Sequence, residues 1–406
     1  MLNLNKNYKY LLACSFGPDS MALLKMLLNE KYNFEVAHVN YNLREEAKKE
    51  TEDLLEYCNK HNITCHVYYV KEAIKTNVEE KCREIRYEYF KSLFDEHKFD
   101  ALLVAHQQDD LIETYYLQKQ RNILPRYYGL QEETVLFGMN VIRPLLNYKK
   151  SELLDFCKEN QVPFAIDSTN LLDIYARNKI RHEIVEKMDD IQRKEVIEII
   201  YEENIELAKQ YEQVDKLEGL TNQQMLELDP VIFRLYLNKL AKDVSPDFEV
   251  SKKVAREIRK LLQSNKPNIS FPVSKSLRFM KEYETSFFDF ENEMVNFYFL
   301  LEEAGKLDTP YFYLDFTKGA SNRNVKEGDY PLVIRNANYD DSYVIKNYPV
   351  KVRRLFIDWK MPMSLRKRWP VILNKDNKII YIPRYQKNFN PDMNCNFYVK
   401  KHISLK

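Results

Sequence analysis

Residues 10–28 read YLLACSFGPDSMALLKMLL, and the rest of the chain is organised around this stretch. An apolar run ends at Cys14, loop residues follow at 15–20, and apolar side chains then recur at helical spacing. This pattern predicts a buried strand, a tight loop and a helix. Such a loop directs backbone N–H groups and the positive end of the helix dipole at one point, where Ser15 and Ser20 add hydroxyl groups. It is a candidate phosphate site; an ordinary turn with Asp19 or Ser20 as N-cap is the alternative.

Length and composition limit the class of protein. The chain has 406 residues and a net charge of +1, which suits two or three domains and excludes a uniformly basic nucleic-acid binder. It contains seven glycines, against about 28 at average usage. The six cysteines form no C-x-x-C pair, which favours a reducing compartment and argues against a zinc or iron–sulfur cluster. Without a signal peptide or a long uncharged apolar stretch, we expect a cytoplasmic protein that does not enter a membrane.

Strands and helices alternate over the first part of the chain. Further strands are expected at residues 34–39, 64–70 and 101–105, with helices at 44–61 and 78–96. This order predicts an α/β domain with a doubly wound parallel sheet, whose ligands lie at the carboxyl ends of the strands. Polar clusters follow the strands at residues 15–20, 38–44 and 106–113, so we expect them to share that edge.

The third polar cluster, HQQDDLIET at residues 106–114, begins where a strand ends and continues as a helix. Asp109 and Glu113 are four residues apart and Asp110 and Glu113 three apart, so acidic side chains share a helix face near the cleft. The alternative is helix capping by Asp109, with the other acids favoured by the dipole in the first turn.

The loop at residues 15–20 lacks the Gly-Lys-Ser/Thr ending of a P-loop, and no G-x-G-x-x-G occurs. It resembles the S-G-G-x-D-S loop of the PP-loop ATP pyrophosphatases, with Phe16 in place of the first glycine. Further blocks resemble, in order, those of the tRNA(Ile)-lysidine synthases: HVNYNLR (38–44), NVEEKCREIRYEYF (77–90), AHQQDDLIET (105–114), VIRPLL (141–146) and DSTNLLDIYARNKIR (167–181). The second block departs from the family pattern H-V-N-H-G-L-R at Tyr41 and Asn42.

The resemblance implies a Rossmann-like PP-loop domain and a ligase. Lysidine synthases join free L-lysine to C2 of the wobble cytidine of tRNA(Ile) with a CAU anticodon, through an adenylated tRNA, and release AMP and pyrophosphate. The resemblance also implies contacts to ATP from Ser15, Phe16, Gly17, Pro18, Asp19, Ser20, His38 and His106. Asp19 is the candidate ligand of Mg²⁺ and a candidate catalytic residue.

The same resemblance implies where lysine and tRNA bind. An acidic pocket would bind the lysine ammonium and accept its proton, since an unperturbed pKa of about 10.4 keeps that amine charged at pH 7. Asp110 and Glu113 are the candidates, and both are candidate catalytic residues, with Arg177 for the lysine carboxylate. The candidates for phosphates or tRNA are Arg83, Arg86, Arg143 and Arg181. Helix-surface salt bridges are the alternative role for these arginines.

The rest of the chain is predicted to form two further domains. Residues 188–219 have the pattern of a long linking helix, residues 220–293 that of a helical module, and residues after 298 that of a small, mostly β (α+β) domain. We therefore expect domains at 1–187, 188–293 and 294–406, the last binding tRNA.

A basic segment in the last domain supports this prediction. Residues 346–368 hold eight Lys or Arg against one acid, interleaved with Phe356, Trp359 and the adjacent Trp369. Such a mixture suits phosphate contact and base stacking, with Arg353 and Arg354 as candidates. A solvated charged face is the alternative. The segment is also similar to the terminal domain of lysidine synthases, which favours tRNA binding.

Two other functions compete with lysidine synthesis. One is another PP-loop tRNA-modifying enzyme, such as a thiolase, although the lack of C-x-x-C argues against the 2-thiocytidine type. The other is a catalytically inactive tRNA-binding homologue, against which the presence of Asp19, His106, Asp109 and Asp110 argues. The oligomeric state is open, a homodimer included.

Overall fold

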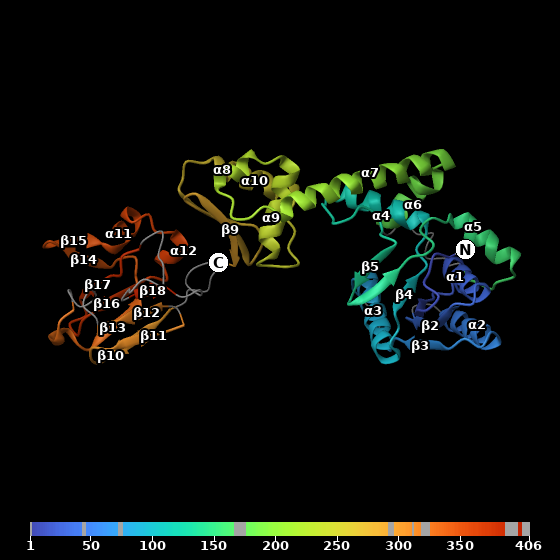
Figure 1. Cartoon of the computed structure of the whole chain (residues 1–406), viewed down its shortest axis with the longest axis horizontal. Helices are drawn as coiled ribbons and strands as arrows, with labels where there is room; N and C mark the ends of the chain where they lie inside the picture. Colours follow the sequence, from blue (N-terminus) through green and yellow to red (C-terminus); the bar gives the residue numbers. More distant parts are fainter. Residues whose placement is uncertain are drawn as a thin grey trace. The chain divides into compact units, whose positions relative to one another are not determined.

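The computed structural model describes residues 2–42, 46–71, 76–165, 176–290, 296–310, 312–317, 325–385 and 397–399. The chain forms two compact units, Met1–Gln213 and Val214–Lys406 (Figure 1). The predicted division into three domains stays a prediction. Within the described residues, no helix is both long enough and apolar enough to cross a membrane.

The first unit is built on a six-stranded sheet in the order β3-β2-β1-β4-β6-β5. Its strands are β1 (Lys9–Ala13), β2 (Asn33–Asn40), β3 (Cys65–Tyr69), β4 (Ala101–Val104), β5 (Glu133–Leu136) and β6 (Met139–Ile142). All neighbours pair in parallel except β5 with β6. The sequence did not predict this hairpin. Its two-residue turn consists of Phe137 and Gly138, both at positive φ, and Phe at such a position is not a usual turn signal.

Helices cover both faces of this sheet, which confirms the doubly wound α/β fold. Alternate residues of β1 point to opposite faces. Leu12 packs in one core with α1 (Pro18–Asn29), α2 (Glu46–Lys60) and α5 (Lys150–Glu159), and Leu11 packs in the other with α3 (Val78–His97). Both leucines are fully buried, and each contributes about 1.5–3 kcal/mol to stability.

The order of strands reverses between β1 and β4, because β2 lies on one side of β1 and β4 on the other. The loops after β1 and β4 therefore flank the switch point where such folds bind ligands. Here α4 (Gln108–Gln120) begins, and it packs against α6 (Ala176–Glu183) and the short η2 (Val185–Lys187). The predicted long helix is α7 (Asp190–Asp215), whose Ile200 and Leu207 pack against Leu111 of α4.

The second unit begins with the helices α8 (Asn222–Glu227), α9 (Pro230–Lys242) and α10 (Lys252–Gln263). An antiparallel sheet of β7 (Asn268–Pro272), β8 (Leu277–Glu282) and β9 (Thr285–Phe290) follows. The prediction of a helical module up to residue 293 is therefore wrong for residues 268–290. Leu277 and Phe279 lie on one face of β8, and Phe279 packs edge-on against Phe288 of β9.

The last part of the second unit is mostly β, as predicted. It holds β10 (Tyr298–Leu301), β11 (Lys306–Asp308), β12 (Phe312–Asp315), β13 (Leu332–Asn336), β14 (Ser342–Ile345), β15 (Tyr348–Lys351), β16 (Pro370–Leu373), β17 (Ile379–Tyr381) and β18 (Phe397–Val399), with η4 (Glu327–Asp329), α11 (Val352–Asp358) and α12 (Met363–Arg366). Its strands form a sheet in the order β10-β13-β16-β17, a sheet in the order β11-β12-β18, and the hairpin β14–β15. Phe356 and Trp369 are buried in the core of this part, and the Trp369 indole donates to the carbonyl of Pro383 at 2.7 Å. They are therefore not available for the base stacking that the sequence suggested.

Candidate active site

The loop after β1 is tied together by its serines. The Ser20 hydroxyl is buried and donates to the carbonyl of Gly17 at 3.0 Å, while the Ser15 N–H points at the Ser20 oxygen at 3.3 Å. Gly17 is the N-cap of α1 and Pro18 occupies the first helical turn, where its missing N–H costs nothing. The following N–H groups at the start of α1 are available to an anion, as in other helix N-termini.

Phe16 has a φ of 66°, in the left-handed region that favours glycine. Glycine, which the S-G-G-x-D-S pattern that this loop resembles has at this position, adopts such a φ without strain. Phe16 compensates by burying its ring in the core below the loop, where it is 3% exposed. Asn42, at the second position where a family glycine is replaced, also has a positive φ, of 53°. Asn tolerates this region better than most residues.

The pKa of Asp19, the carboxyl group of this loop, is strongly perturbed. Burial, reinforced by the nearby Asp110, raises the pKa of Asp19 to about 7, although Lys150 and Arg181 act in the opposite direction. Its Oδ1 is buried and has no hydrogen-bond partner within the described part of the chain. A buried, unsatisfied carboxylate oxygen beside a phosphate-type loop is the donor that a hard divalent cation such as Mg²⁺ requires.

A cavity of about 700 Å³ opens at this edge of the sheet. Its lining joins the loop to the carboxyl ends of β2 and β4 and to α3 and α6. The predicted site residues that line it are Ser15, Gly17, Pro18, Asp19, Ser20, His38, His106, Asp110, Arg83, Arg86 and Arg181. The three polar clusters of the sequence therefore meet in one cavity.

The two histidines of the cavity are held by the protein itself. His38 Nδ1 lies 2.8 Å from the carbonyl of Cys14, to which it donates, and Nε2 lies 3.0 Å from the Thr51 hydroxyl. Burial lowers the pKa of His38 and, despite the opposing effect of Asp110, lowers that of His106 to about 4. His106 Nδ1 accepts a hydrogen bond from Arg143 Nε at 3.0 Å. Both rings are therefore neutral at pH 7, and this arrangement favours a role in holding the strand ends over direct binding of phosphate charge.

The start of α4 differs from the capping expected from the sequence. Gln107, not Asp109, is the N-cap: its side chain accepts from the Asp109 N–H at 2.7 Å, and Asp110 accepts from the Gln107 N–H at 3.0 Å. Asp109 is buried and forms an ion pair with Arg193 of α7, which also donates to the carbonyl of Val185 at 2.8 Å. Asp109 therefore connects α4 to α7 and η2.

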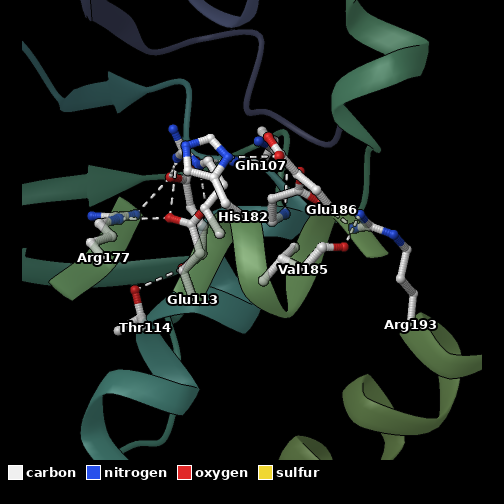
Figure 2. Close-up of polar contacts among 11 residues, drawn as sticks. Gln107, Glu113, Thr114, Arg177, His182, Val185, Glu186 and Arg193 are labelled. Atoms are coloured by element: carbon white, nitrogen blue, oxygen red, sulfur yellow. Dashed lines mark hydrogen bonds and ion pairs between the residues drawn. The ribbon is translucent and has the colours of Figure 1, made fainter. Parts of the chain in front are cut away.

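Asp110 and Glu113 are paired with arginines of α6. Figure 2 shows Glu113 beside Arg177. Arg177 donates to Asp110 Oδ1 and to Glu113 Oε2, both at 2.7 Å, and Arg181 donates to Glu113 Oε1 at 2.5 Å. Glu113 is fully buried, whereas Asp110 and Arg181 line the cavity. Burial opposes ionisation of Asp110, but His106 and Arg177 outweigh it and hold the pKa of Asp110 below its ordinary value. Two carboxylates thus face two guanidinium groups, and Asp110 and Arg181 are the carboxylate and the guanidinium at the cavity wall.

The remaining predicted arginines lie in different surroundings. Arg83 and Arg86 of α3 line the cavity, and the Arg83 guanidinium stacks over Tyr87 at 4.7 Å. Arg143 is 4% exposed and donates to His106 and to the carbonyl of Gln131, which favours a positioning role over tRNA contact. Residues 167–175 of the last sequence block lie outside the described residues.

Arg353 and Arg354 lie on the exposed side of α11, in the second unit. The Arg353 guanidinium stacks over the ring of Tyr339 at 4.3 Å, and Tyr339 is 72% exposed. Arg354 forms an exposed ion pair with Asp358 at 3.2 Å. An exposed aromatic side chain in contact with one of the predicted basic residues is thus Tyr339, which the sequence analysis did not single out.

The sequence analysis also missed Lys150, His182 and Glu186, which line the cavity. Lys150 is the first residue of α5, and His182 Nδ1 lies 2.7 Å from Glu186 Oε2. The spacing of His182 and Glu186, four residues apart on a helical segment, was the only signal of this pair. Nothing in the sequence placed either of them beside the phosphate loop.

Comparisons with known proteins agree with this geometry. Residues 1–188 match the PP-loop domain family. A tRNA(Ile)-lysidine synthase of Ureaplasma parvum is 38% identical over 188 residues, which is 45% of this chain and 56% of that protein. Two similar proteins of the same name align over nearly their whole length: that of Mycoplasma mycoides is 28% identical over 94% of this chain and 98% of its own, and that of Bacillus subtilis 26% over 96% and 92%.

Proposed function

Since this chain belongs to the tRNA(Ile)-lysidine synthase family, we propose that it joins free lysine to the wobble cytidine of tRNA(Ile) with a CAU anticodon. In the first half-reaction the C2 oxygen of the cytosine attacks the α-phosphorus of ATP, and pyrophosphate leaves. In the second, the lysine ε-amine attacks C2, AMP leaves, and the amine loses a proton. The other PP-loop functions considered from the sequence are not favoured.

The loop and α1 supply the groups that the first half-reaction needs. N–H groups at the start of α1 point toward the phosphate position, and the Ser15–Ser20 contacts keep the loop in one conformation before ATP binds. Lys150 and Arg181 add positive charge beside Asp19, where the leaving pyrophosphate gains negative charge. The unsatisfied Asp19 Oδ1 fits a Mg²⁺ ligand. When bound, Mg²⁺ supplies charge stabilisation on the phosphate oxygens.

The lysine pocket is proposed at the wall made by Asp110 and Arg181. Asp110 carries a negative charge because its pKa is lowered, and it lines the cavity, so it suits the lysine ammonium. Glu113 is fully buried and bonded to both arginines, so its proposed part is to hold Arg177 and Arg181 in place. Arg181, the arginine at the cavity wall, then suits the lysine carboxylate, whereas Arg177, the candidate from the sequence, is not among the described residues that line the cavity.

The second unit is proposed to bind the tRNA body through the exposed face of α11. Arg353 and Arg354 offer positive charge, and Tyr339 presents an exposed ring beside Arg353. This combination suits contact with the phosphate backbone and stacking on a base. A homodimer and a cytoplasmic location are proposals from the sequence alone.

The observation that carries the proposal is the meeting of the phosphate loop, Asp19 and the Asp110–Arg181 wall in one cavity. The test is incubation of purified protein with labelled ATP, lysine and unmodified tRNA(Ile). We expect AMP, pyrophosphate and lysidine in equal amounts, and no ATP cleavage without tRNA. Release of ADP and orthophosphate would contradict the proposal.

The two half-reactions can be separated with Asp110→Asn, which keeps the shape of the side chain and removes its charge. Lysine binding should fall by roughly 10- to 100-fold, since a charged hydrogen bond contributes about 1.5–3 kcal/mol. Adenylated tRNA should then accumulate in a single turnover and be converted at high lysine. Glu183→Gln on the exposed side of α6 is the matched control. If Asp110→Asn abolishes adenylation and leaves lysine affinity unchanged, Asp110 acts on ATP and the lysine pocket lies elsewhere.

A further inference from the structure

A second group of polar side chains lies at the opposite edge of the first unit's sheet. Glu35 stands near the start of β2, His66 near the start of β3, and His97 at the end of α3. Because β2 and β3 run parallel, their amino-terminal ends lie at the edge away from the candidate active site. The proposed lysine ligation uses none of these three side chains.

The three side chains converge on one oxygen atom. His66 Nε2 lies 2.6 Å from Glu35 Oε2, and His97 Nδ1 lies 4.0 Å from the same oxygen. The two imidazole rings are 4.8 Å apart between centroids. One ligand atom from each residue lies within 4.8 Å of the other two. The side chains are 17–33% exposed, so the group is partly desolvated and still reached by water.

Lys9 fixes the orientation of the Glu35 carboxylate. Its ammonium lies 2.7 Å from the other oxygen, Oε1, and also 4.6 Å from the centre of the Phe99 ring. Glu35 Oε2 is therefore turned toward the two imidazoles. A hydrogen-bonded partner that orients a ligating carboxylate is a regular feature of metal sites. Hard cations such as Mg²⁺ and Ca²⁺ prefer oxygen ligands, so a set with two imidazoles and one carboxylate does not suit them.

We propose that Glu35, His66 and His97 form a binding site for a divalent transition metal of the Zn²⁺ class, with water completing the coordination. Two imidazole nitrogens and one carboxylate oxygen are donors that suit Zn²⁺ and Co²⁺. Metal–ligand bonds of about 2.0–2.2 Å in a tetrahedron place the ligand atoms about 3.4 Å apart. The Glu35–His66 pair must open and the His97 ring must approach Glu35, each by less than about 1 Å, and the two imidazole nitrogens, within 4.8 Å of each other, must close by at most about 1.4 Å, which side-chain rotation can provide.

Titration calorimetry of the tag-free full-length protein with ZnCl₂ tests this site. We expect one equivalent to bind, and Co²⁺ to give the visible absorption of a four- or five-coordinate ion. His66→Ala, His97→Ala and Glu35→Gln should each weaken binding by at least about tenfold. His61→Ala is the matched control, because His61 is outside the group and packs against Tyr57.

The variants need a check that they fold and that thiols are not the ligands. Each variant should keep the circular dichroism spectrum and metal-free melting temperature of the parent, and His97→Gln replaces His97→Ala if the latter unfolds. Cys65→Ser tests the neighbouring thiol and should leave Zn²⁺ binding unchanged. The proposal is overturned if Zn²⁺ does not bind below about 100 µM. It is also overturned if binding survives loss of both histidines, or if it disappears in Cys65→Ser.

Discussion

Asp19→Asn should stabilise the protein while removing its activity. The pKa of Asp19 is raised from 3.8 to about 7, so the folded state holds this proton more tightly than the unfolded chain does. Between about pH 4 and pH 7 the folded state therefore binds more protons, and its stability falls as the pH rises through this window. Below pH 4 the carboxyl is protonated in both states and the effect vanishes.

The size of the effect follows from the pKa difference. A shift of about 3 units corresponds to at most about 4 kcal/mol of destabilisation above pH 7. Asparagine removes the charge and keeps the shape, but its buried amide can remain without a partner at a cost of about 1–3 kcal/mol. We expect a net gain of about 1–3 kcal/mol at pH 8, or several degrees in Tm for a unit of this size, and no gain near pH 4.

The assay is thermal unfolding by circular dichroism at pH 4, 6 and 8, without and with Mg²⁺ and ATP. The variant should melt above the parent at pH 8 and should lose the additional stabilisation by Mg²⁺ and ATP. Adenylation of tRNA should fall by about 10² or more. Asp155→Asn, on the exposed face of α5, is the matched control and should change neither the melting temperature nor the adenylation rate. An Asp19→Asn variant that melts below the parent at pH 8, or that adenylates tRNA normally, would refute the buried-charge reasoning.

Three further outcomes are expected. Glu113→Gln should lower the free energy of unfolding by about 3–5 kcal/mol, because Arg177 and Arg181 then lose a buried partner. The control Glu183→Gln, at an exposed position, should change it little. Equal effects of the two variants in denaturant titrations would exclude a buried network. Phe16→Gly relieves about 1–2 kcal/mol of backbone strain but loses about 3–5 kcal/mol of core packing, so it should destabilise, and a higher Tm would contradict this balance. Arg353→Ala with Arg354→Ala should reduce the salt slope of tRNA binding by about 0.7–0.9 for each phosphate that the variant no longer neutralises, with ATP affinity unchanged. Lys375→Ala with Lys378→Ala is the control, and an unchanged slope in the first pair would leave α11 a solvated face.

The fold of the first unit could be predicted from contiguous stretches of sequence. The strand, loop and helix at residues 10–28, and the alternation that follows, are local patterns of period 2 and 3.6, and the structure has them at the expected places. The meeting of three polar clusters at one edge also followed, because parallel strands bring their carboxyl ends together. The sequence did not predict the hairpin β5–β6 or the sheet β7–β9, because short strands and an unusual turn give weak local signals.

The partner of each charged group could be identified only from the tertiary structure. Arg177 meets Glu113 across 64 residues, and Arg193 meets Asp109 across 84, so no local pattern reveals that these charges neutralise one another. The same holds for Trp369, whose indole is buried in a core although it stands next to a basic run. Local patterns predict which face of a helix or strand is apolar. Whether a charged side chain on that element is buried, paired or desolvated depends on which distant elements pack over it.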